Sequence, residues 1–322
     1  MTNLLITGAS GFIGKALYAL LTAEACNTEY GSIGVAVRLP TVIGEGTVPF
    51  VVGDIDATTD WTEALHSVDA VVHLAARVHV MRDDTVEPLA VFRKVNVDGT
   101  MNLVRQAAQA GVRRFIFISS IKVNGEFTLP DNPFSAEDIP APVDPYAISK
   151  YEAEQALREF ADKTTMEFVI IRPPLVYGSG VKANFYTMMR WLDNKIPLPL
   201  GAIDNRRSLL ALDNLVDLIR LCIKHPAAAN QVFLVADGDD MSTTQLLHRV
   251  AVALGKNALL LPVPVYLLMF VARLFNKTAA AQRLCCSLQV DISKAHRLLG
   301  WIPPVSVNDA LAKTAQDYIK NR

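Results

Sequence analysis

The sequence predicts an α/β protein built on a doubly wound parallel sheet, and two observations carry that prediction. Short apolar runs that do not alternate with polar residues recur along the chain. Strands buried on both faces have this composition. Stretches with helical periodicity separate the runs, and repeated strand–helix–strand units imply right-handed crossovers. The expected strands are 4–7, 35–37, 50–52, 70–74, 115–118, 168–171 and 231–235, and the expected helices are 12–22, 97–110, 147–162, 185–192, 209–223 and 307–319.

Length and composition suggest two unequal domains. The chain has 322 residues, of which 51% are hydrophobic and 20% charged, so a large core is possible and wholesale disorder is excluded. The predicted boundary lies near Val176. Residues 1–176 form the expected sheet domain, to which the chain returns at 207–235. Residues 177–206 and 236–322 form a smaller, mixed α/β substrate domain on the C-terminal side.

Charge and cysteine usage exclude several classes of protein. Lys and Arg number 31 and Asp and Glu 32, giving a net charge of -1, so no nucleic-acid partner is expected. The four cysteines match no zinc spacing, so no metal site is expected and a reducing compartment is favoured. No secretory leader opens the sequence, which predicts a cytoplasmic protein. The cysteines are Cys26, Cys222, Cys285 and Cys286.

One apolar segment complicates that interpretation. Residues 258–272 carry no charge, but they are fewer than the roughly 20 residues that span a bilayer. Pro262 and Pro264 interrupt them as well. No transmembrane span is therefore expected. A buried helix or loop of the smaller domain is the main interpretation, and contact with a membrane surface is the alternative.

A glycine-rich turn follows the first expected strand and opens the first helix. Gly8, Gly11 and Gly14 remove side chains where backbone must approach a pyrophosphate and where the helix packs on the strand. The helix N-terminus adds unpaired N–H groups and a positive dipole end. A turn without a ligand is the alternative, but the position between strand and helix favours a dinucleotide site. Its expected lining is Gly8, Ser10, Gly11, Phe12, Ile13 and Gly14.

Tyr146 and Lys150 form a candidate catalytic pair. Residues four apart share one face of a helix, so a lysine ammonium can lie beside the phenol. A nearby cation disfavours the neutral phenol and lowers its pKa from about 10 toward neutrality, where it can exchange protons. A solvent-facing pair is the alternative. The location just after Asp144 and Pro145, downstream of the glycine turn, favours catalysis.

These motifs resemble the extended short-chain dehydrogenases/reductases, a family that includes nucleotide-sugar epimerases, dehydratases and keto-reductases. Its typical turn is T-G-x-x-G-x-x-G, found here at residues 7–14. The resemblance implies a Rossmann sheet, an NAD(P) cofactor and a homodimer. It also implies a catalytic triad of Ser120, Tyr146 and Lys150, with Ser119 as a structural neighbour. Asn124 departs from the family, which commonly has Tyr there, so contacts with the sugar that differ from those of the family are expected here.

The choice of dinucleotide depends on Arg38. An acidic residue after the second strand would bind the ribose hydroxyls of NAD, whereas a guanidinium attracts a 2′-phosphate. NADP(H) is therefore favoured, with NAD(H) possible, and a solvated surface arginine is the alternative. The other cofactor contacts implied by the resemblance are Asp54, Ile55, Leu74, Ala75, Ala76, Asn96, Ser119, Tyr146, Lys150 and Pro173.

The resemblance also suggests a substrate side. Asn184 and Arg207 match diphosphate contacts of a UDP-sugar, with Arg206 as the rival of Arg207, while Ser120 and Tyr146 face the sugar. The main hypothesis is a 4-keto-sugar reductase of surface-polysaccharide synthesis, which acts at carbon 4 of a UDP-hexose. The alternative is a UDP-sugar 4-epimerase with tightly bound NAD.

Two further functions are less favoured. A 4,6-dehydratase needs a carboxylate after the catalytic Ser/Thr, where this chain has Ile121 and Lys122. A non-catalytic dinucleotide sensor would have lost Tyr146 or Lys150, and both are present.

Overall fold

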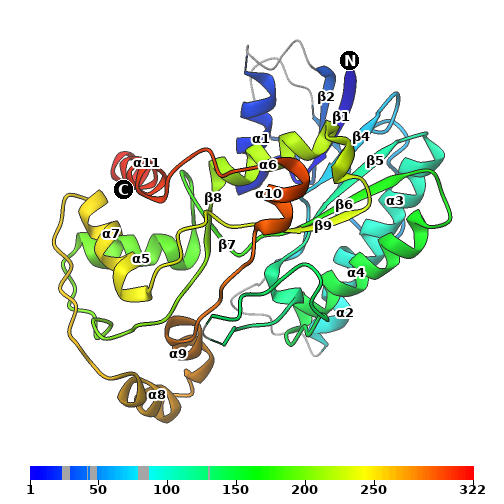
Figure 1. The fold of residues 1–322 in the computed structure, drawn as a ribbon. Coiled ribbons are helices and arrows are strands. Elements are labelled where there is room, and N and C mark those ends of the chain that lie inside the picture. The colour runs from blue at the N-terminus through cyan, green and yellow to red at the C-terminus, as the bar shows by residue number, and fades with distance from the viewer. Residues whose placement is uncertain (24–29, 42, 44–48, 79–86, 130) are drawn as a thin grey trace.

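A seven-stranded parallel sheet forms the centre of the molecule (Figure 1). The structure is a computed structural model that describes residues 1–23, 30–41, 43, 49–78, 87–129 and 131–322, so Cys26 lies outside the described residues. The strand order is β3-β2-β1-β4-β5-β6-β9, and it reverses between β1 and β4. The predicted doubly wound fold is confirmed. The strands are β1 (Thr2–Thr7), β2 (Tyr30–Val37), β3 (Phe50–Val51), β4 (Ala70–His73), β5 (Arg114–Ile118), β6 (Glu167–Arg172) and β9 (Gln231–Leu234).

Helices bury both faces of this sheet, which explains why its strands are apolar throughout. In β5, Ile116 contributes to one core while Phe115 and Phe117 contribute to the other, because successive side chains point to opposite faces. One face packs against α1 (Phe12–Thr22), α6 (Leu212–Lys224) and α10 (Ser293–Leu299). The other packs chiefly against α3 (Thr100–Gln109) and α4 (Pro145–Ala161), and α2 (Pro88–Arg93) packs on α4.

Two expected helices are wrong in part. The expected helix 97–110 is divided into a π-helix, η1 (Lys94–Gly99), and α3. The expected helix 209–223 begins with a strand, β8 (Leu209–Ala211), before α6. β8 pairs in parallel with β7 (Leu175–Tyr177), and this pairing overrides the local helical pattern. Two short 3₁₀ helices complete this half of the chain, η2 (Ile121–Val123) and η3 (Pro226–Ala228).

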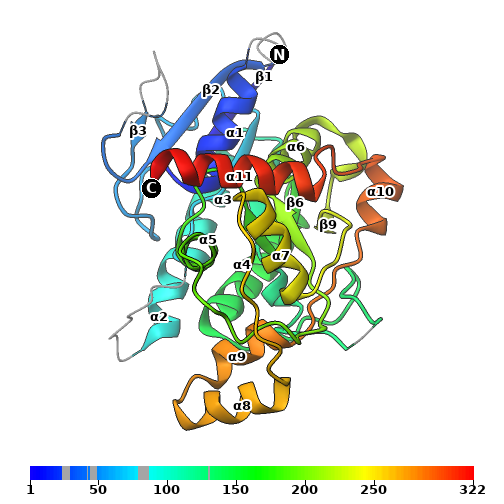
Figure 2. The same ribbon diagram turned by 90° about the vertical axis from the view of Figure 1, so that its left-hand side faces the viewer.

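A smaller lobe has its own core beyond β7 and β8. It consists of α5 (Ala183–Asp193), α7 (Thr243–Ala253) and α11 (Val307–Asn321) (Figure 2). α10 lies between α7 and α11 in sequence, yet its residues Ala295 and Leu299 belong to the core that covers the large sheet. The division into 1–176 with 207–235, and 177–206 with 236–322, stays a prediction.

Two further helices, α8 (Val265–Leu274) and α9 (Thr278–Cys285), project from the smaller lobe (Figures 1 and 2). The expectation that 258–272 is buried is wrong. No residue of α8 is buried, and Tyr266 is 76% exposed. In the part of the chain that the structure describes, no helix is long and apolar enough to cross a membrane.

Candidate active site

The glycine turn lies at the carboxyl end of β1, next to the point where the strand order reverses. Gly8 has φ +68°, and a Cβ there would lie 2.7 Å from the backbone nitrogen of Ala75. A Cβ on Gly14 would lie 2.3 Å from the Gly8 carbonyl oxygen. The backbone can therefore make this turn only because Gly8 and Gly14 lack side chains. A hydrogen bond of 2.9 Å from Gly11 N–H to the Gly8 carbonyl closes it.

The start of α1 is suited to a bound phosphate. Gly11 is its N-cap and supplies no side-chain acceptor, and the first turn contains no acidic residue. Ser10, just before the cap, is exposed, and Phe12 and Ile13 form the first turn. The N–H groups and positive dipole end at this terminus are satisfied by an anion. The residues present thus fit the pyrophosphate of a dinucleotide.

A buried polar chain, which sequence reasoning missed, fixes the neighbouring strand ends. The Thr7 hydroxyl lies 2.7 Å from Nδ1 of His73, whose Nε2 lies 3.1 Å from the Thr100 hydroxyl. Burial lowers the pKa of His73 to about 3, with the charge of Lys150 adding to the effect, so the ring is neutral. The sequence feature that could have indicated this polar chain is His73, a histidine at the end of an otherwise apolar strand.

The same chain positions the turn after β4. The Ala75 N–H donates to the Thr7 hydroxyl at 3.3 Å, and the Leu74 N–H donates to the Thr7 carbonyl at 3.3 Å. Leu74, Ala75 and Ala76 therefore run directly beside the glycine turn, as expected for residues that pass along a dinucleotide.

Ser120 and Tyr146 meet just beyond β5. Ser120 caps η2, and Tyr146 lies in the first turn of α4, whose N-cap Asp144 accepts from the Ala147 N–H at 2.7 Å. The Ser120 and Tyr146 side chains lie close enough for the Ser120 hydroxyl to affect the pKa of the phenol. Two groups from different elements, predicted separately, are thus brought together where the parallel strands end.

The pKa of Tyr146 departs from the sequence-based expectation. It is raised above its usual value of 10.0, chiefly by burial and then by the negative charge of Asp144, while the Ser120 hydroxyl opposes the rise. The expected lowering by a neighbouring ammonium is therefore wrong in the described structure. Loss of hydration destabilises the phenolate more than the nearby groups stabilise it.

Lys150 points to the end of the sheet instead. Its Nζ donates to the Ile118 carbonyl at 2.8 Å and lies 4.4 Å from the centre of the Phe117 ring. Burial lowers the pKa of Lys150 to about 7, and the charge of Glu154 only partly counteracts this. The amine thus stands one helical turn beyond Tyr146 and changes protonation near neutral pH.

A buried ion pair, also missed from the sequence, holds α4 against β6. Arg172 donates through Nε and Nη2 to the two carboxylate oxygens of Glu154 at 2.9 and 2.5 Å, and through Nη1 to Asn124 Oδ1 at 2.9 Å. The Asn124 amide donates to the Ser135 carbonyl at 2.9 Å. Asn124, the departure from the family pattern, is therefore part of the scaffold under the site.

Asn96 lies behind the site. Its Oδ1 accepts from the Arg77 N–H at 2.8 Å, and its Nδ2 donates to the Arg77 carbonyl and the Ser149 hydroxyl, both at 3.0 Å. These bonds tie the segment after β4 to α4. Asn96 thus positions the cofactor-side backbone, and Ser149 is a supporting residue that the sequence analysis did not identify.

Ser119 and Pro173 lie where β5 and β6 end. The Ser119 N–H donates to the Ile171 carbonyl at 2.8 Å, and the Ile121 N–H donates to the Pro173 carbonyl at 3.0 Å. The Ser119 hydroxyl is buried and has no hydrogen-bond partner among the residues that the structure describes. An orphaned buried hydroxyl is costly, so it fits a site completed by a polar ligand.

Arg38 and Asp54 meet at the ends of β2 and β3. Arg38 Nε lies 3.3 Å from Asp54 Oδ1, and their side chains are 71% and 79% exposed. Ile55 packs under η1, where a Cβ on Gly99 would lie 2.7 Å from it. The carboxylate offsets the charge of the guanidinium that was expected to attract a 2′-phosphate.

The other expected substrate residues, Asn184 and Arg207, lie in the chain beyond β7. Arg207 Nη1 donates to the carbonyls of Arg283 and Cys286 at 2.7 and 3.1 Å, and burial lowers the pKa of this guanidinium. Arg206, its rival, is exposed, as is Asn184 in the first turn of α5. The structure thus anchors Arg207 against the end of α9.

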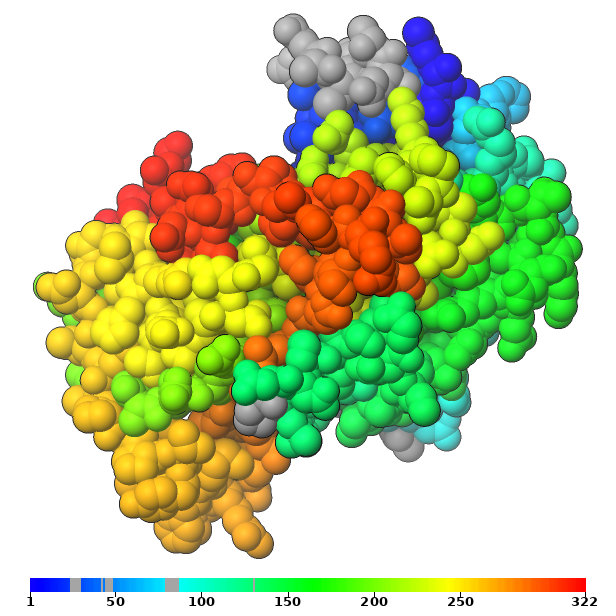
Figure 3. Space-filling view, in the orientation of Figure 1, coloured from blue at the N-terminus to red at the C-terminus, as the bar shows by residue number. Residues whose placement is uncertain are grey.

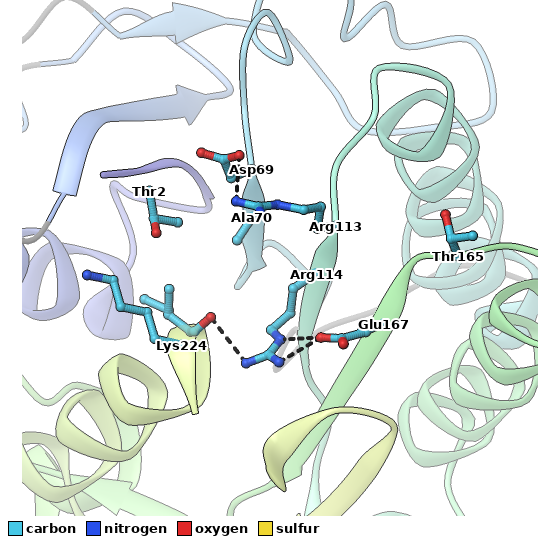
Figure 4. A pocket seen from close by; sticks show the side chains of 9 residues that line it. Thr2, Asp69, Ala70, Arg113, Arg114, Thr165, Glu167 and Lys224 are labelled. Carbon is cyan, nitrogen blue, oxygen red and sulfur yellow. Dashed lines mark hydrogen bonds and ion pairs between the residues drawn. The ribbon is translucent and has the colours of Figure 1, made fainter. Parts of the chain in front are cut away.

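A polar pocket of about 520 Å³ occupies the opposite edge of the sheet (Figure 4). It is lined by Thr2, Ala70, Arg114 and Glu167, which lie at the amino ends of their strands. Arg114 pairs with Glu167 at 2.6 Å. Ligands of open α/β sheets bind at the carboxyl ends, so this pocket is separate from the candidate active site.

The fold and the site define a class of protein. A parallel sheet with a glycine turn beside its switch point, and with Ser120, Tyr146 and Lys150 gathered beyond β5, is the arrangement of a short-chain dehydrogenase/reductase. Residues 4–236 match the model of the NAD dependent epimerase/dehydratase family. The chain belongs to this family, and the resemblance drawn from its motifs is confirmed.

Several relatives match nearly the whole chain, among them two that are named 4-epimerases. A protein from Vibrio cholerae named UDP-glucose 4-epimerase is 49% identical over 319 residues, covering 99% of this chain and 96% of the relative. A protein from Escherichia coli O157:H7 named N-acetyl-alpha-D-glucosaminyl-diphospho-ditrans,octacis-undecaprenol 4-epimerase is 30% identical over 334 residues, covering 98% and 94%.

Solved structures share the fold over the full length. A dTDP-glucose 4,6-dehydratase from Streptomyces venezuelae, described with NAD bound, is 25% identical and superposes with a TM-score of 0.78, covering 100% of this chain and 98% of that one. Structures of the same fold at 20% and 22% identity are described with NAD and with NADPH. The fold therefore accommodates either dinucleotide, and the expected homodimer stays a prediction.

Proposed function

We propose that the protein is a UDP-sugar 4-epimerase, which oxidises carbon 4 of a UDP-hexose and then reduces it from the opposite face. The observation that carries the proposal is the proximity of the Ser120 and Tyr146 side chains beyond β5, at the same end of the sheet as the dinucleotide-binding turn. The two relatives described above are both named 4-epimerases, one at 49% identity. The comparisons thus favour the alternative hypothesis over the 4-keto reductase that the sequence analysis preferred.

The residues have distinct roles in this proposal. A nicotinamide dinucleotide bound at the glycine turn supplies the acceptor and donor of the hydride. In its phenolate form, Tyr146 would accept the proton of the C4 hydroxyl during the oxidation and would return it to the C4 oxygen during the reduction from the other face. Ser120 donates to the C4 oxygen and keeps Tyr146 aligned. Lys150 holds the ribose from the end of β5.

The second candidate function is a 4-keto-sugar reductase that uses NADPH, and Arg38 is the residue that favours it. The guanidinium suits a 2′-phosphate, yet Asp54 lies 3.3 Å from it, and a carboxylate there repels that phosphate. We therefore propose NAD as the resident dinucleotide, with NADP(H) as the cofactor of the reductase alternative.

A 4,6-dehydratase fits less well. Lys122 follows Ser120 after one residue, where that reaction needs a carboxylate, and it forms an ion pair with Asp144. A cation therefore stands near the triad where an acid–base carboxylate is required.

Incubation with UDP-glucose and with UDP-N-acetylglucosamine tests the proposal. We expect interconversion with the C4 epimer, followed by NMR, without net change in the absorbance of reduced nicotinamide. Tyr146→Phe is expected to lose about 10²-fold or more in turnover, since it removes the proton-transfer group. Tyr266→Phe, an exposed position on α8, is the matched control. Stoichiometric consumption of NADPH by a UDP-4-keto sugar, with no interconversion, would establish the reductase instead.

A further inference from the structure

α8 carries an exposed apolar stripe that the proposed function does not use. Tyr266, Phe270 and Leu274 follow one another at intervals of four residues and are 76%, 60% and 65% exposed. Leu267, Val271 and Phe275 form a parallel row that is also exposed. Residues four apart share a helix face, so the six side chains make one continuous surface. A patch of this kind marks a binding surface in a water-soluble protein.

The stripe adjoins an apolar hollow of about 530 Å³ between α8 and the loop at Pro199. Leu268, Val271 and Phe275 line it, and Lys277 stands at its rim. Figure 3 shows this segment as the protrusion at one end of the molecule, so its outer side is accessible. An apolar hollow edged by a cation matches an acyl chain below a charged headgroup.

The charge around the stripe is entirely positive along the chain. Residues 256–290 contain no Asp or Glu, although the whole protein has a net charge of -1. Arg273, Lys277 and Arg283 are exposed, and no ion pair to them occurs in the described ranges. The fourth cation, Lys256, lies 3.6 Å from Asp193 and is offset by it. Three exposed cations therefore lie close to the apolar stripe along the chain, and no acidic residue lies among them.

We propose that α8 and the cations beside it seat the protein on the surface of an anionic lipid bilayer. α8 has ten residues, about 15 Å of helix, so it lies in the plane of the interface and does not cross the membrane. Aromatic and aliphatic side chains enter the headgroup region while Arg273, Lys277 and Arg283 meet the phosphates. A second copy of this chain is a poorer occupant, because it would bring the same cations against each other.

Co-sedimentation of the full-length protein with vesicles tests the proposal, which is independent of the sugar and the reaction. We expect binding to phosphatidylglycerol–phosphatidylcholine vesicles that weakens with added salt, and little binding to phosphatidylcholine alone. Phe270→Glu is expected to reduce the affinity about tenfold or more. Ile302→Glu, which alters an exposed apolar residue elsewhere, is the control and should bind like the wild type.

Two further measurements separate the possible occupants. Arg273→Glu is expected to lower the affinity at least fivefold and to weaken its dependence on salt. Phe270→Glu should leave turnover in solution unchanged, which excludes unfolding as the cause. Equal vesicle binding by Phe270→Glu and the wild type would overturn the proposal. The proposal would also be overturned if the wild type did not bind anionic vesicles and Phe270→Glu changed the molecular mass measured by light scattering. The stripe would then join two copies of the chain.

Discussion

Replacement of Lys150 by methionine is expected to stabilise the folded protein although it removes a residue of the triad. The Lys150 amine is buried against the Phe117 ring and bonded to the Ile118 carbonyl. Methionine has a similar length and no charge to desolvate. The variant therefore separates the free-energy cost of burying this amine from the role of the amine in catalysis. We expect the variant to be inactive.

The magnitude follows from the pKa. Burial lowers the pKa of Lys150 from 10.5 to about 7, and one pKa unit corresponds to about 1.4 kcal/mol, so the charged amine costs folding about 5 kcal/mol below pH 7. Because the pKa is lower in the folded state, the unfolded chain holds the extra proton between these values. The cost therefore declines as pH rises and vanishes near pH 10.5, leaving about 2 kcal/mol at pH 9.

The assay compares two pH values, so that losses independent of pH cancel. The methionine variant also loses the bond to Ile118, worth about 1 kcal/mol at any pH. We expect the stability gained by Lys150→Met to be about 3 kcal/mol larger at pH 6 than at pH 9, in urea unfolding of proteins freed of nucleotide. Lys163→Met, at an exposed position, is the control. An equal gain in stability at pH 6 and at pH 9 would contradict the conclusion that burial desolvates the Lys150 amine.

Three other predictions follow from the site. Asp144→Asn keeps an N-cap but removes the negative charge that helps to raise the pKa of Tyr146. The rising limb of the pH–rate profile should therefore move to a lower pH by about half a unit to one unit. An unchanged profile would show that Asp144 does not affect the titration of Tyr146. Asp54→Ala should raise the NADP/NAD affinity ratio, measured by calorimetry, because it leaves the charge of Arg38 unopposed, whereas Arg38→Ala should lower it; ratios that do not differ between the two variants would contradict the reasoning. Arg172→Ala should lower the unfolding free energy by about 3–5 kcal/mol, since it removes the nearer, bidentate partner of the buried Glu154 carboxylate and leaves only Arg158, at 3.9 Å. A loss below about 1 kcal/mol in denaturant titration would mean that water replaces the guanidinium.

Expectations based on local patterns agreed with the structure where one local feature decides the outcome. The glycine turn and the buried strands are of this kind, because Gly8 must adopt a positive φ and β5 must be apolar on both faces. The apolar run at 209–211 fits a helix or a strand equally well, and only its partner β7, more than thirty residues earlier, made it a strand. In the same way, the apolar character of 265–274 could not reveal that no residue of α8 is buried.

The sequence alone determined which chemical groups are available and which elements carry them: the glycines at the end of β1, the Tyr146–Lys150 spacing on α4 and the hydroxyl of Ser120. The tertiary structure decided what surrounds each group. Lys150 meets the Ile118 carbonyl, and Arg172 meets Glu154 and Asn124, across 32, 18 and 48 residues of sequence. Hydration and neighbouring charge set a pKa, and both depend on contacts between distant segments, so the protonation of the site belongs to the fold and not to any motif.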